Sequence, residues 1–317
     1  MKGFAFRRVA AWSSSSGAAR IVLALLLSAS WGCAAAKPTI AIRPAIGTTY
    51  SEQQAGLSAA DQARLDAQCP LGQPRLRRAE DFGMTYIVTR DGYALEASEK
   101  DRIPIWVCER ITRYNVTGPL TGERVKFRAD PLLPVEARAV DRDYTNSGYD
   151  RGHQAPLANQ RRSQRLRDET FFLSNAVPQN SRLNRQAWAA LEERVRDWAE
   201  ARDTIYSITG PLFWDPREDD PSTARGYVEY EWIGRGVSVP THLYKIVIGR
   251  KRDGDGWESV AFVFPNTPYD KTVDFNDFIR PVAWVQRRAG ITFFPKLPGG
   301  QTPAVINSAG SMWDPRE

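Results

Sequence analysis

The sequence predicts an α+β domain, in which an antiparallel sheet packs against helices. Three observations support this class: strand-like runs of β-branched and aromatic residues over 84–111, one long amphipathic helix pattern over 184–202, and further strand-like runs after it. With 317 residues, of which 42% are hydrophobic and 25% charged, the chain can bury a substantial core and has the composition of a folded protein. We expect one main domain.

Residues 1–36 have the layout of a secretory signal. Basic residues precede the short apolar run Ile21–Trp31, small residues follow it, and no acidic residue occurs before Glu52. The run is shorter than the ~20 residues that a membrane helix needs, so we expect no stable membrane span. Cleavage is expected after Ala36, whereas a lipoprotein-type site at Cys33 would place a lipid anchor there. We expect export to the periplasm, the envelope or the extracellular space, with import into an organelle such as the mitochondrion as the alternative.

Residues 37–75 are predicted to be a linker or N-terminal arm, with a short helix over 58–68. The arm ends near Cys69, and the next cysteine is Cys108. In an oxidising compartment these two cysteines could pair and clamp the arm to a strand. Two unpaired thiols fit the sequence equally well.

The strand predictions rest on β-branched and aromatic runs that are bounded by Gly, Pro or Asp-Gly. The clearest is a hairpin over 84–98 that turns at Asp91-Gly92, followed by a strand over 103–111 and an irregular stretch over 130–147. After the long helix, strands are expected over 204–213, 227–234, 241–249 and 257–265, and a last helix over 278–290.

The long helix is predicted to begin near Asn184. Trp188, Leu191, Val195 and Trp198 recur at helical spacing and form one apolar stripe. We therefore expect this helix to lie with its stripe on the sheet.

The formal net charge of +6 is weak evidence for nucleic-acid binding. Four of the 43 basic residues lie in the expected leader, and without them 39 basic residues face 37 acidic ones. Arginine is concentrated locally instead, because seven arginines between residues 151 and 185 face only Asp168 and Glu169. A solvated basic face explains this segment as well as a phosphate-binding one does.

The four residues Asp150-Arg151-Gly152-His153 combine groups that phosphodiester hydrolysis needs. An imidazole titrates near neutral pH, so His153 can accept a proton from water, and the planar guanidinium of Arg151 matches phosphate oxygens. Gly152 is expected to permit a tight turn, and Asp150 to orient a neighbouring group or to stabilise that turn. A lone loop histidine is usually structural, so the tetrapeptide alone does not define a site.

Longer stretches around the tetrapeptide carry a family resemblance. The segments "YDRGHQAPLANQ", "TFFLSNAVPQNSRLNRQAWAALE", "ITGPLF" and "VPTHLYKIVI" resemble the DNA/RNA non-specific endonucleases of the ββα-metal superfamily, most closely the endonuclease G branch and its bacterial relatives. The likeness runs from about Leu76 to Pro295. It implies a ββα-metal nuclease fold over 76–297, with the active site on a ββα element, and leaves 298–317 as a C-terminal tail.

The resemblance assigns the general base to His153 and a phosphate contact to Arg151. It also implies a divalent metal, Mg²⁺ or Mn²⁺, whose single protein ligand is Asn184. One neutral ligand suits Mg²⁺, which keeps several water molecules. Asn175 and Glu192 match family positions that hold the water shell of the metal or the geometry of the site, and Glu192 lies eight residues, about two helical turns, after Asn184.

Five further arginines are candidates for substrate binding. Arg196, one turn beyond Glu192, matches a family arginine, although a surface salt bridge is an equally good explanation. Either Arg124 or Arg128 is expected to supply a phosphate contact, and Arg161 and Arg165 are expected to attract the nucleic-acid backbone.

Two other positions qualify the resemblance. Phe171 stands where some members of the family have a second asparagine, which bears on how the water shell of the metal is held. His242 lies inside a strand-like run and is expected to be structural.

The function that follows is a magnesium-dependent, sugar-non-specific endonuclease. Its partners would be the DNA and RNA backbones. Contacts with the backbone read no base edges, which explains the lack of selectivity. The expected products carry a 5′-phosphate. The resemblance also implies a homodimer. Two alternatives stay open: a non-catalytic, extracellular nucleic-acid-binding protein on the same fold, and a phosphodiesterase for a smaller substrate.

Overall fold

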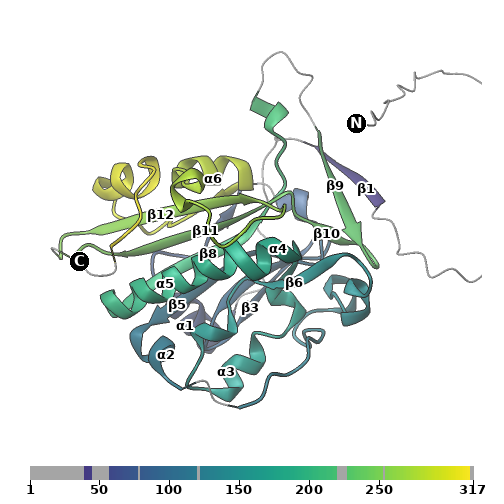
Figure 1. Cartoon of the computed structure of the whole chain (residues 1–317), viewed down its shortest axis with the longest axis horizontal. Coiled ribbons are helices and arrows are strands. Elements are labelled where there is room, and N and C mark those ends of the chain that lie inside the picture. Colours follow the sequence, from purple (N-terminus) through teal and green to yellow (C-terminus); the bar gives the residue numbers. More distant parts are fainter. Residues whose placement is uncertain are drawn as a thin grey trace, which may run out of the picture. The chain divides into compact units, whose positions relative to one another are not determined.

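A six-stranded antiparallel sheet forms the centre of the fold and confirms the predicted α+β class (Figure 1). The computed structural model describes residues 39–44, 57–77, 79–119, 122–219, 227–252 and 254–314, so the expected leader and Cys33 lie outside the described residues. The strand order is β12-β11-β8-β5-β4-β3. These strands are β3 (Thr85–Thr89), β4 (Ala94–Ser98), β5 (Pro104–Thr112), β8 (Thr204–Leu212), β11 (His242–Arg250) and β12 (Trp257–Pro265).

Helices cover both faces of this sheet (Figure 1). On one face lies α5 (Ala189–Arg202), and the predicted stripe of Trp188, Leu191, Val195 and Trp198 is buried against β8, β11 and β12. On the other face, α1 (Ala59–Gln68) and α6 (Val282–Ala289) pack against side chains of β5, β8 and β11. Alternation of side chains along each strand therefore supplies two separate apolar surfaces.

Among the described residues, three smaller antiparallel sheets accompany the main one. Strands β1 (Thr39–Pro44), β9 (Tyr227–Ile233) and β10 (Val237–Val239) form a three-stranded sheet in the order β1-β9-β10. Strand β2 (Arg75–Leu76) pairs with β13 (Ile291–Thr292). Strand β6 (Tyr149–His153) pairs with β7 (Ala176–Asn180), and this pair carries the tetrapeptide.

The remaining helices are short. They are η1 (Ala79–Phe82), α2 (Arg113–Thr117), η2 (Val135–Ala137), η3 (Asp141–Tyr144), η4 (Leu157–Asn159), α3 (Gln164–Glu169), η5 (Leu173–Asn175), α4 (Ser181–Leu183), η6 (Asn184–Trp188), η7 (Pro216–Asp219), η8 (Phe275–Phe278), η9 (Gly299–Gln301) and η10 (Pro303–Asn307). None of the helices in the part of the chain described above is long and apolar enough to cross a membrane.

Two helix boundaries differ from the prediction. The long helix begins at Ser181 rather than near Asn184, because the side chain of Asn180 accepts the backbone N–H groups of Arg182 and Leu183 and caps the first turn. The last helix begins only at Val282, because the preceding proline cannot donate a hydrogen bond to a helical turn before it.

The expected arm and tail both contribute to the core. Ser58 caps α1, and Leu65 of that helix is buried. The disulfide between Cys69 and Cys108 ties the end of α1 to β5, with a Cα–Cα distance of 5.8 Å. Buried residues beyond position 298 are Val305, Ile306 and Trp313. The packed unit therefore extends beyond 76–297 on both sides.

Candidate active site

A ββα unit carries the candidate residues. Strands β6 and β7 run antiparallel, with His153 opposite Ala176, and β7 leads through the cap residue Asn180 into α4, η6 and α5. These three segments follow one another without a break, and a π-helical turn begins at Asn184. Single π-helical turns inside α-helices are often found at functional sites.

The ring of His153 lies in an aromatic pocket. Its centroid is 4.8 Å from that of Phe127 and 5.0 Å from that of Phe171, which meets it edge-on at 88°. Its Nε2 is buried and has no hydrogen-bond partner among the described residues. Burial, and next the positive charge of Arg124, lower the pKa of His153 to about 3. The imidazole is therefore neutral near pH 7, and its Nε2 lone pair or proton has no partner within the described ranges.

Asp150, three residues before His153 on the same strand, contacts the helix. The Nδ2 of Asn184 donates a 2.9 Å hydrogen bond to Asp150 Oδ2, and Arg185 donates to both carboxylate oxygens at 2.8 and 2.7 Å. Asp150 thus orients a neighbouring group, which was one of the two roles predicted for it.

Asn184 fits the role of a metal ligand in its chemistry. Its amide nitrogen is committed to Asp150, which leaves the amide oxygen as a neutral donor of the kind that Mg²⁺ prefers. No cluster of three or more His, Cys, Asp or Glu side chains within the described ranges could hold a metal ion. A single neutral amide oxygen suits an ion that keeps most of its water.

Gly152 is required for a different reason from the predicted turn. It lies inside β6, and its φ is not in the left-handed region. A Cβ at this position would lie 2.0 Å from Oε1 and 2.7 Å from Cβ of Gln179, which is fully buried on β7. The glycine therefore allows the Gln179 side chain to cross the strand. The turn is made before it, where Asn146 and Gly148 have positive φ.

Asn175 holds the loop that follows His153. Its Oδ1 accepts the backbone N–H of Ala155 at 2.9 Å, and its Nδ2 donates to the carbonyls of Ala155 and Thr170 at 2.9 and 3.0 Å. The side chain is fully buried. Of the two roles predicted for it, this geometry supports shaping the site rather than holding the water shell.

The guanidinium of Arg151 contacts η3, the short helix before β6. Its Nη2 lies 2.8 Å from Asp141 Oδ1 and donates to the Asp141 carbonyl at 2.9 Å. Its Cζ lies 5.1 Å from the centre of the Tyr144 ring. The carboxylate of Asp141 is well exposed, so a phosphate oxygen can exchange with it as the partner of Arg151.

Of the two alternative arginines, Arg124 is the one near His153. It is exposed, it lowers the pKa of His153, and its Cζ lies 5.5 Å from the centre of the Phe171 ring. Arg128 instead packs on Phe172, with 4.1 Å between Cζ and the ring centre. Phe171, the departure from the family pattern, forms one wall of the histidine pocket.

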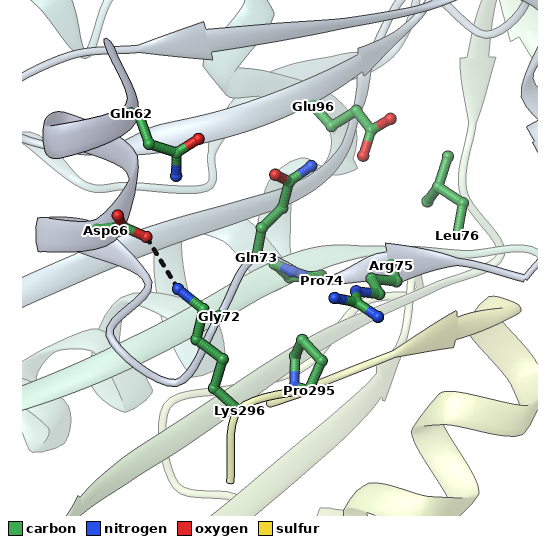
Figure 2. Close-up of a pocket in the computed structure, with 10 residues that line it drawn as sticks. All are labelled: Gln62, Asp66, Gly72, Gln73, Pro74, Arg75, Leu76, Glu96, Pro295 and Lys296. Carbon is green, nitrogen blue, oxygen red and sulfur yellow. Dashed lines mark hydrogen bonds and ion pairs between the residues drawn. The ribbon is translucent and has the colours of Figure 1, made fainter. Parts of the chain in front are cut away.

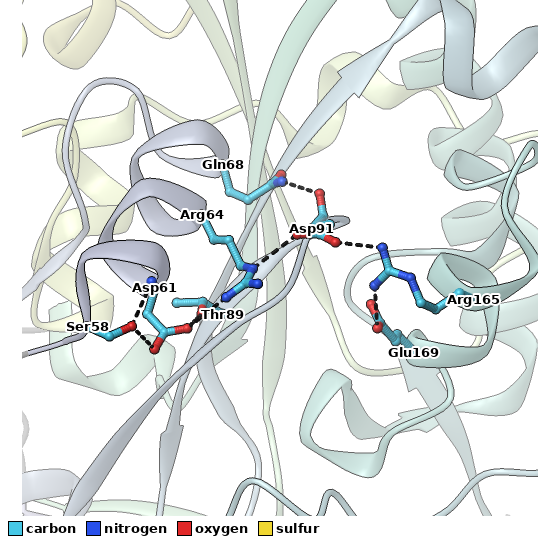
Figure 3. A network of polar contacts seen from close by, with 8 residues as sticks. All are labelled: Ser58, Asp61, Arg64, Gln68, Thr89, Asp91, Arg165 and Glu169. Carbon is cyan, nitrogen blue, oxygen red and sulfur yellow. Dashed lines mark hydrogen bonds and ion pairs between the residues drawn. The ribbon is translucent and has the colours of Figure 1, made fainter.

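Much of the basic segment is neutralised within the fold. Arg165 contacts Asp91 at 2.6 Å and Glu169 at 2.9 Å, inside a network that reaches Arg64 and Asp61 of α1 (Figure 3). Outside that network, Arg161 donates to the carbonyl of Gly118 at 2.6 Å. The guanidinium groups of Arg165 and Arg161 are thus both held by contacts within the fold.

Glu192 and Arg196 lie near two buried charged residues, Lys245 and Glu109, which we call the buried polar strip. No motif in the sequence singled out these two residues. Burial raises the pKa of Glu192, while Lys245 and then Arg196 lower it. Lys245 is buried on β11, donates to Thr209 Oγ1 at 2.6 Å, and lies 5.3 Å from the centre of the Trp188 ring. A charged residue in the middle of an apolar strand was the signal that could have revealed it.

The same strip contains Glu109 of β5, which is also buried. It accepts hydrogen bonds from Asn159 at 2.9 Å and from Gln160 at 3.3 Å, both in the stretch after the tetrapeptide. Burial raises its pKa to about 7, against the lowering effect of Lys245. The second histidine, His242, packs on Trp214 with 4.8 Å between ring centroids, consistent with the expected structural role.

A separate pocket of about 260 Å³ lies beside α1, the helix on the sheet face that α5 does not cover (Figure 2). It is lined by Asp66 of α1, by Glu96 of β4 and by Lys296, and Asp66 and Lys296 are 3.3 Å apart. The buried carboxylate of Glu96 accepts hydrogen bonds from Thr85 and Trp106. None of the predicted site residues lines this pocket.

Comparison with known proteins agrees with this geometry. The family model for the DNA/RNA non-specific endonucleases matches residues 79–299. Human mitochondrial endonuclease G is 35% identical over 216 residues, which cover 68% of this chain and 71% of the relative. The endonuclease G of Caenorhabditis elegans is 34% identical over 236 residues, covering 73% and 75%, and a nuclease of Syncephalastrum racemosum is 36% identical over 218 residues, covering 67% and 68%.

A solved structure shows the same fold. The chain aligns with EndoG in a crystal structure of the EndoG/EndoGI complex, at a TM-score of 0.67 and 32% identity, over 77% of this chain and 96% of that one. The sheet and the ββα unit thus define a nuclease with the ββα-metal fold. The chain belongs to the DNA/RNA non-specific endonuclease family.

Proposed function

We propose that this nuclease hydrolyses phosphodiester bonds of both DNA and RNA with His153 as the general base and Asn184 as the direct metal ligand. The observation that carries the proposal is the hydrogen bond by which Asp150 of β6, three residues before His153, orients the amide of Asn184. The same strand ends at His153, whose imidazole is neutral near pH 7.

In this mechanism His153 accepts the proton of the attacking water. Its low pKa keeps the ring neutral, and the packing of Phe127 and Phe171 against it restricts its orientation. Arg124 and Arg151 bind non-bridging phosphate oxygens, the latter after exchanging its contact with Asp141.

Asn184 would hold a divalent cation, Mg²⁺ or Mn²⁺, through its amide oxygen. When bound, such a cation offsets negative charge on the phosphate and on the leaving oxygen. Glu192 and Arg196 lie further along the same helix, where Glu192 is suited to hold water and Arg196 to contact the backbone of the substrate. In-line attack of water would leave a 5′-phosphate.

The cellular site is part of the proposal. The Cys69–Cys108 disulfide favours an oxidising compartment, which fits export. The relatives named as mitochondrial support the organelle alternative. A homodimer and a lipid anchor at Cys33 stay predictions.

The decisive experiment is a digestion assay on plasmid DNA and single-stranded RNA, with Mg²⁺ and with EDTA, for the wild type and for His153→Ala. We expect metal-dependent cleavage of both substrates and its loss in the variant. Binding without cleavage would favour the nucleic-acid-binding alternative. Cleavage of small phosphodiesters alone would favour the other alternative. Activity of His153→Ala within a few-fold of wild type would remove His153 as the base.

A further inference from the structure

The segment that follows β12 fastens the start of the helix that carries Asn184. Asn266 makes four hydrogen bonds there. Its Oδ1 accepts the backbone N–H of Asn180 at 2.8 Å, and its Nδ2 donates to the carbonyls of Pro178 at 3.0 Å and Pro240 at 2.9 Å. Its backbone N–H donates to the carbonyl of Thr241 at 2.8 Å.

The side-chain bonds use both N–H donors and the acceptor oxygen of the carboxamide. One acceptor and two donors converge on three backbone groups from β7 and from the connection between β10 and β11. Asn266 therefore joins the ββα unit to the edge of the main sheet, 86 residues further along the chain.

The contact continues into the helix through Asn180. The backbone N–H of Asn180 is held by Asn266, while its side-chain Oδ1 caps the helix by accepting the N–H groups of Arg182 at 3.0 Å and Leu183 at 3.3 Å. Asn184 follows directly after Leu183. Asn184 therefore lies about one turn after the cap residue that Asn266 holds.

We propose that Asn266 is a positioning residue for the metal site, acting through Asn180 on Asn184. This inference rests on the proposed metal role of Asn184. A ligand on the first turns of a helix moves with the helix end, and a site of this kind tolerates displacements of only about 0.5 Å. A hydrogen-bonding partner behind a ligand typically contributes about 10- to 100-fold to metal affinity or activity.

The chain offers a matched control in the same segment. Arg182 and Asp270 form an ion pair of 2.6 Å that also links the start of the helix to the residues after β12, but both side chains are 58% exposed. Exposed pairs contribute little to stability, so this link should not position the ligand. Leu65→Ala supplies a second control, because it opens the core beneath α1 on the opposite face of the sheet.

The experiment compares Asn266→Ala, Asn266→Asp, Asp270→Ala and Leu65→Ala in the full chain. Two quantities are measured: the Mg²⁺ concentration for half-maximal plasmid cleavage, and the amide hydrogen exchange of Arg182 and Leu183 in the metal-free protein. The thermal midpoint of each variant shows how much stability it has lost.

We expect Asn266→Ala to raise the half-maximal Mg²⁺ concentration by about tenfold or more and to accelerate exchange at both amides. Asn266→Asp keeps the acceptor for Asn180 but loses both donors, so it should change both readouts in the same direction by less. Asp270→Ala should stay within about twofold of wild type, and Leu65→Ala should lower the thermal midpoint without changing the Mg²⁺ requirement.

Unchanged exchange and an unchanged Mg²⁺ requirement in both Asn266 variants would overturn the inference, as would an equal effect of Leu65→Ala. Asn184→Ala separates this failure from that of the proposed function. If Asn184→Ala leaves the Mg²⁺ requirement unchanged, the metal assignment is wrong, and the positioning of a metal ligand by Asn266 is overturned with it. If Asn184→Ala raises the requirement and the Asn266 variants do not, only the inference fails.

Discussion

Asn184 Nδ2 and Asp150 Oδ2 are 2.9 Å apart, and this hydrogen bond joins the first strand of the ββα unit to its helix. It fixes which end of the Asn184 amide faces the strand. Because a side-chain amide has one oxygen and one nitrogen, the bond that holds the nitrogen against Asp150 also directs the oxygen away from Asp150.

Asp150→Asn should therefore raise the Mg²⁺ concentration that cleavage requires, by about tenfold or more, because a neutral amide neither orients Asn184 in one way nor neutralises Arg185. A magnesium titration of plasmid cleavage measures this. Arg185→Ala is the matched control, since it removes only the exposed partner of the same carboxylate. An equal effect of the two substitutions would mean that the ion pair, not the Asn184 bond, is what matters.

Arg124→Gln should raise the pKa of His153, because Arg124 adds to the effect of burial in keeping it low. The folded-state pKa of about 3 lies below the unfolded value of about 6.5. The contribution of His153 to the free energy of unfolding is thus fully present above pH ~6.5 and is lost as the pH falls toward 3. NMR titration of the ring protons measures the shift, and the chain has only two histidines to assign. A ring that titrates near pH 6 in the wild type would contradict the buried, neutral state.

Gly152→Ala should destabilise the protein by about 1–3 kcal/mol, because the new Cβ overlaps the side chain of Gln179. Urea unfolding measures the loss. Adding Gln179→Ala should restore only part of the stability, since it removes the nearest atom, Oε1, but leaves Cβ of residue 179 only 2.7 Å away. Full restoration would show that only the far end of the glutamine matters.

Replacing Cys69 and Cys108 by serine should lower the free energy of unfolding by about 2–4 kcal/mol, because loss of the disulfide raises the conformational entropy of the unfolded chain. Both cysteines lie on the sheet face opposite α5, so the folded variant should keep its Mg²⁺ requirement and its cleavage rate at low temperature. Urea unfolding and a cleavage assay test the two halves of this statement separately. A changed Mg²⁺ requirement would mean that strain passes through the sheet to the site.

The fold was largely predictable because its signals are local. The hairpin over 84–98 has two strand-like runs around Asp-Gly, and the stripe from Trp188 to Trp198 has a helical period. Helix ends were less predictable. Asn180 is a good cap residue, but Ser181 and Asn184 nearby can also cap a helix, so the sequence alone does not identify the first residue.

The residues of the candidate site could be predicted where they belong to a sequence motif. Their contacts could not be predicted where the partner lies far away in the sequence. Asp141 for Arg151 and Asp91 for Arg165 are pairs that only the fold brings together. The reason for Gly152 lies in Gln179 on the next strand, which no local pattern reveals. Phe127 reaches the His153 ring from a stretch with no regular structure.

Trp313 makes the burial of the helix in the ββα unit depend on a residue far along the chain. Its carbonyl accepts the indole N–H of Trp198 at 2.7 Å, and its ring covers the end of the helix that carries Glu192. A ribosome that has made the ββα unit must translate more than 100 further residues before that cover exists. The apolar face of the helix is therefore completed only when residue 313 has been made.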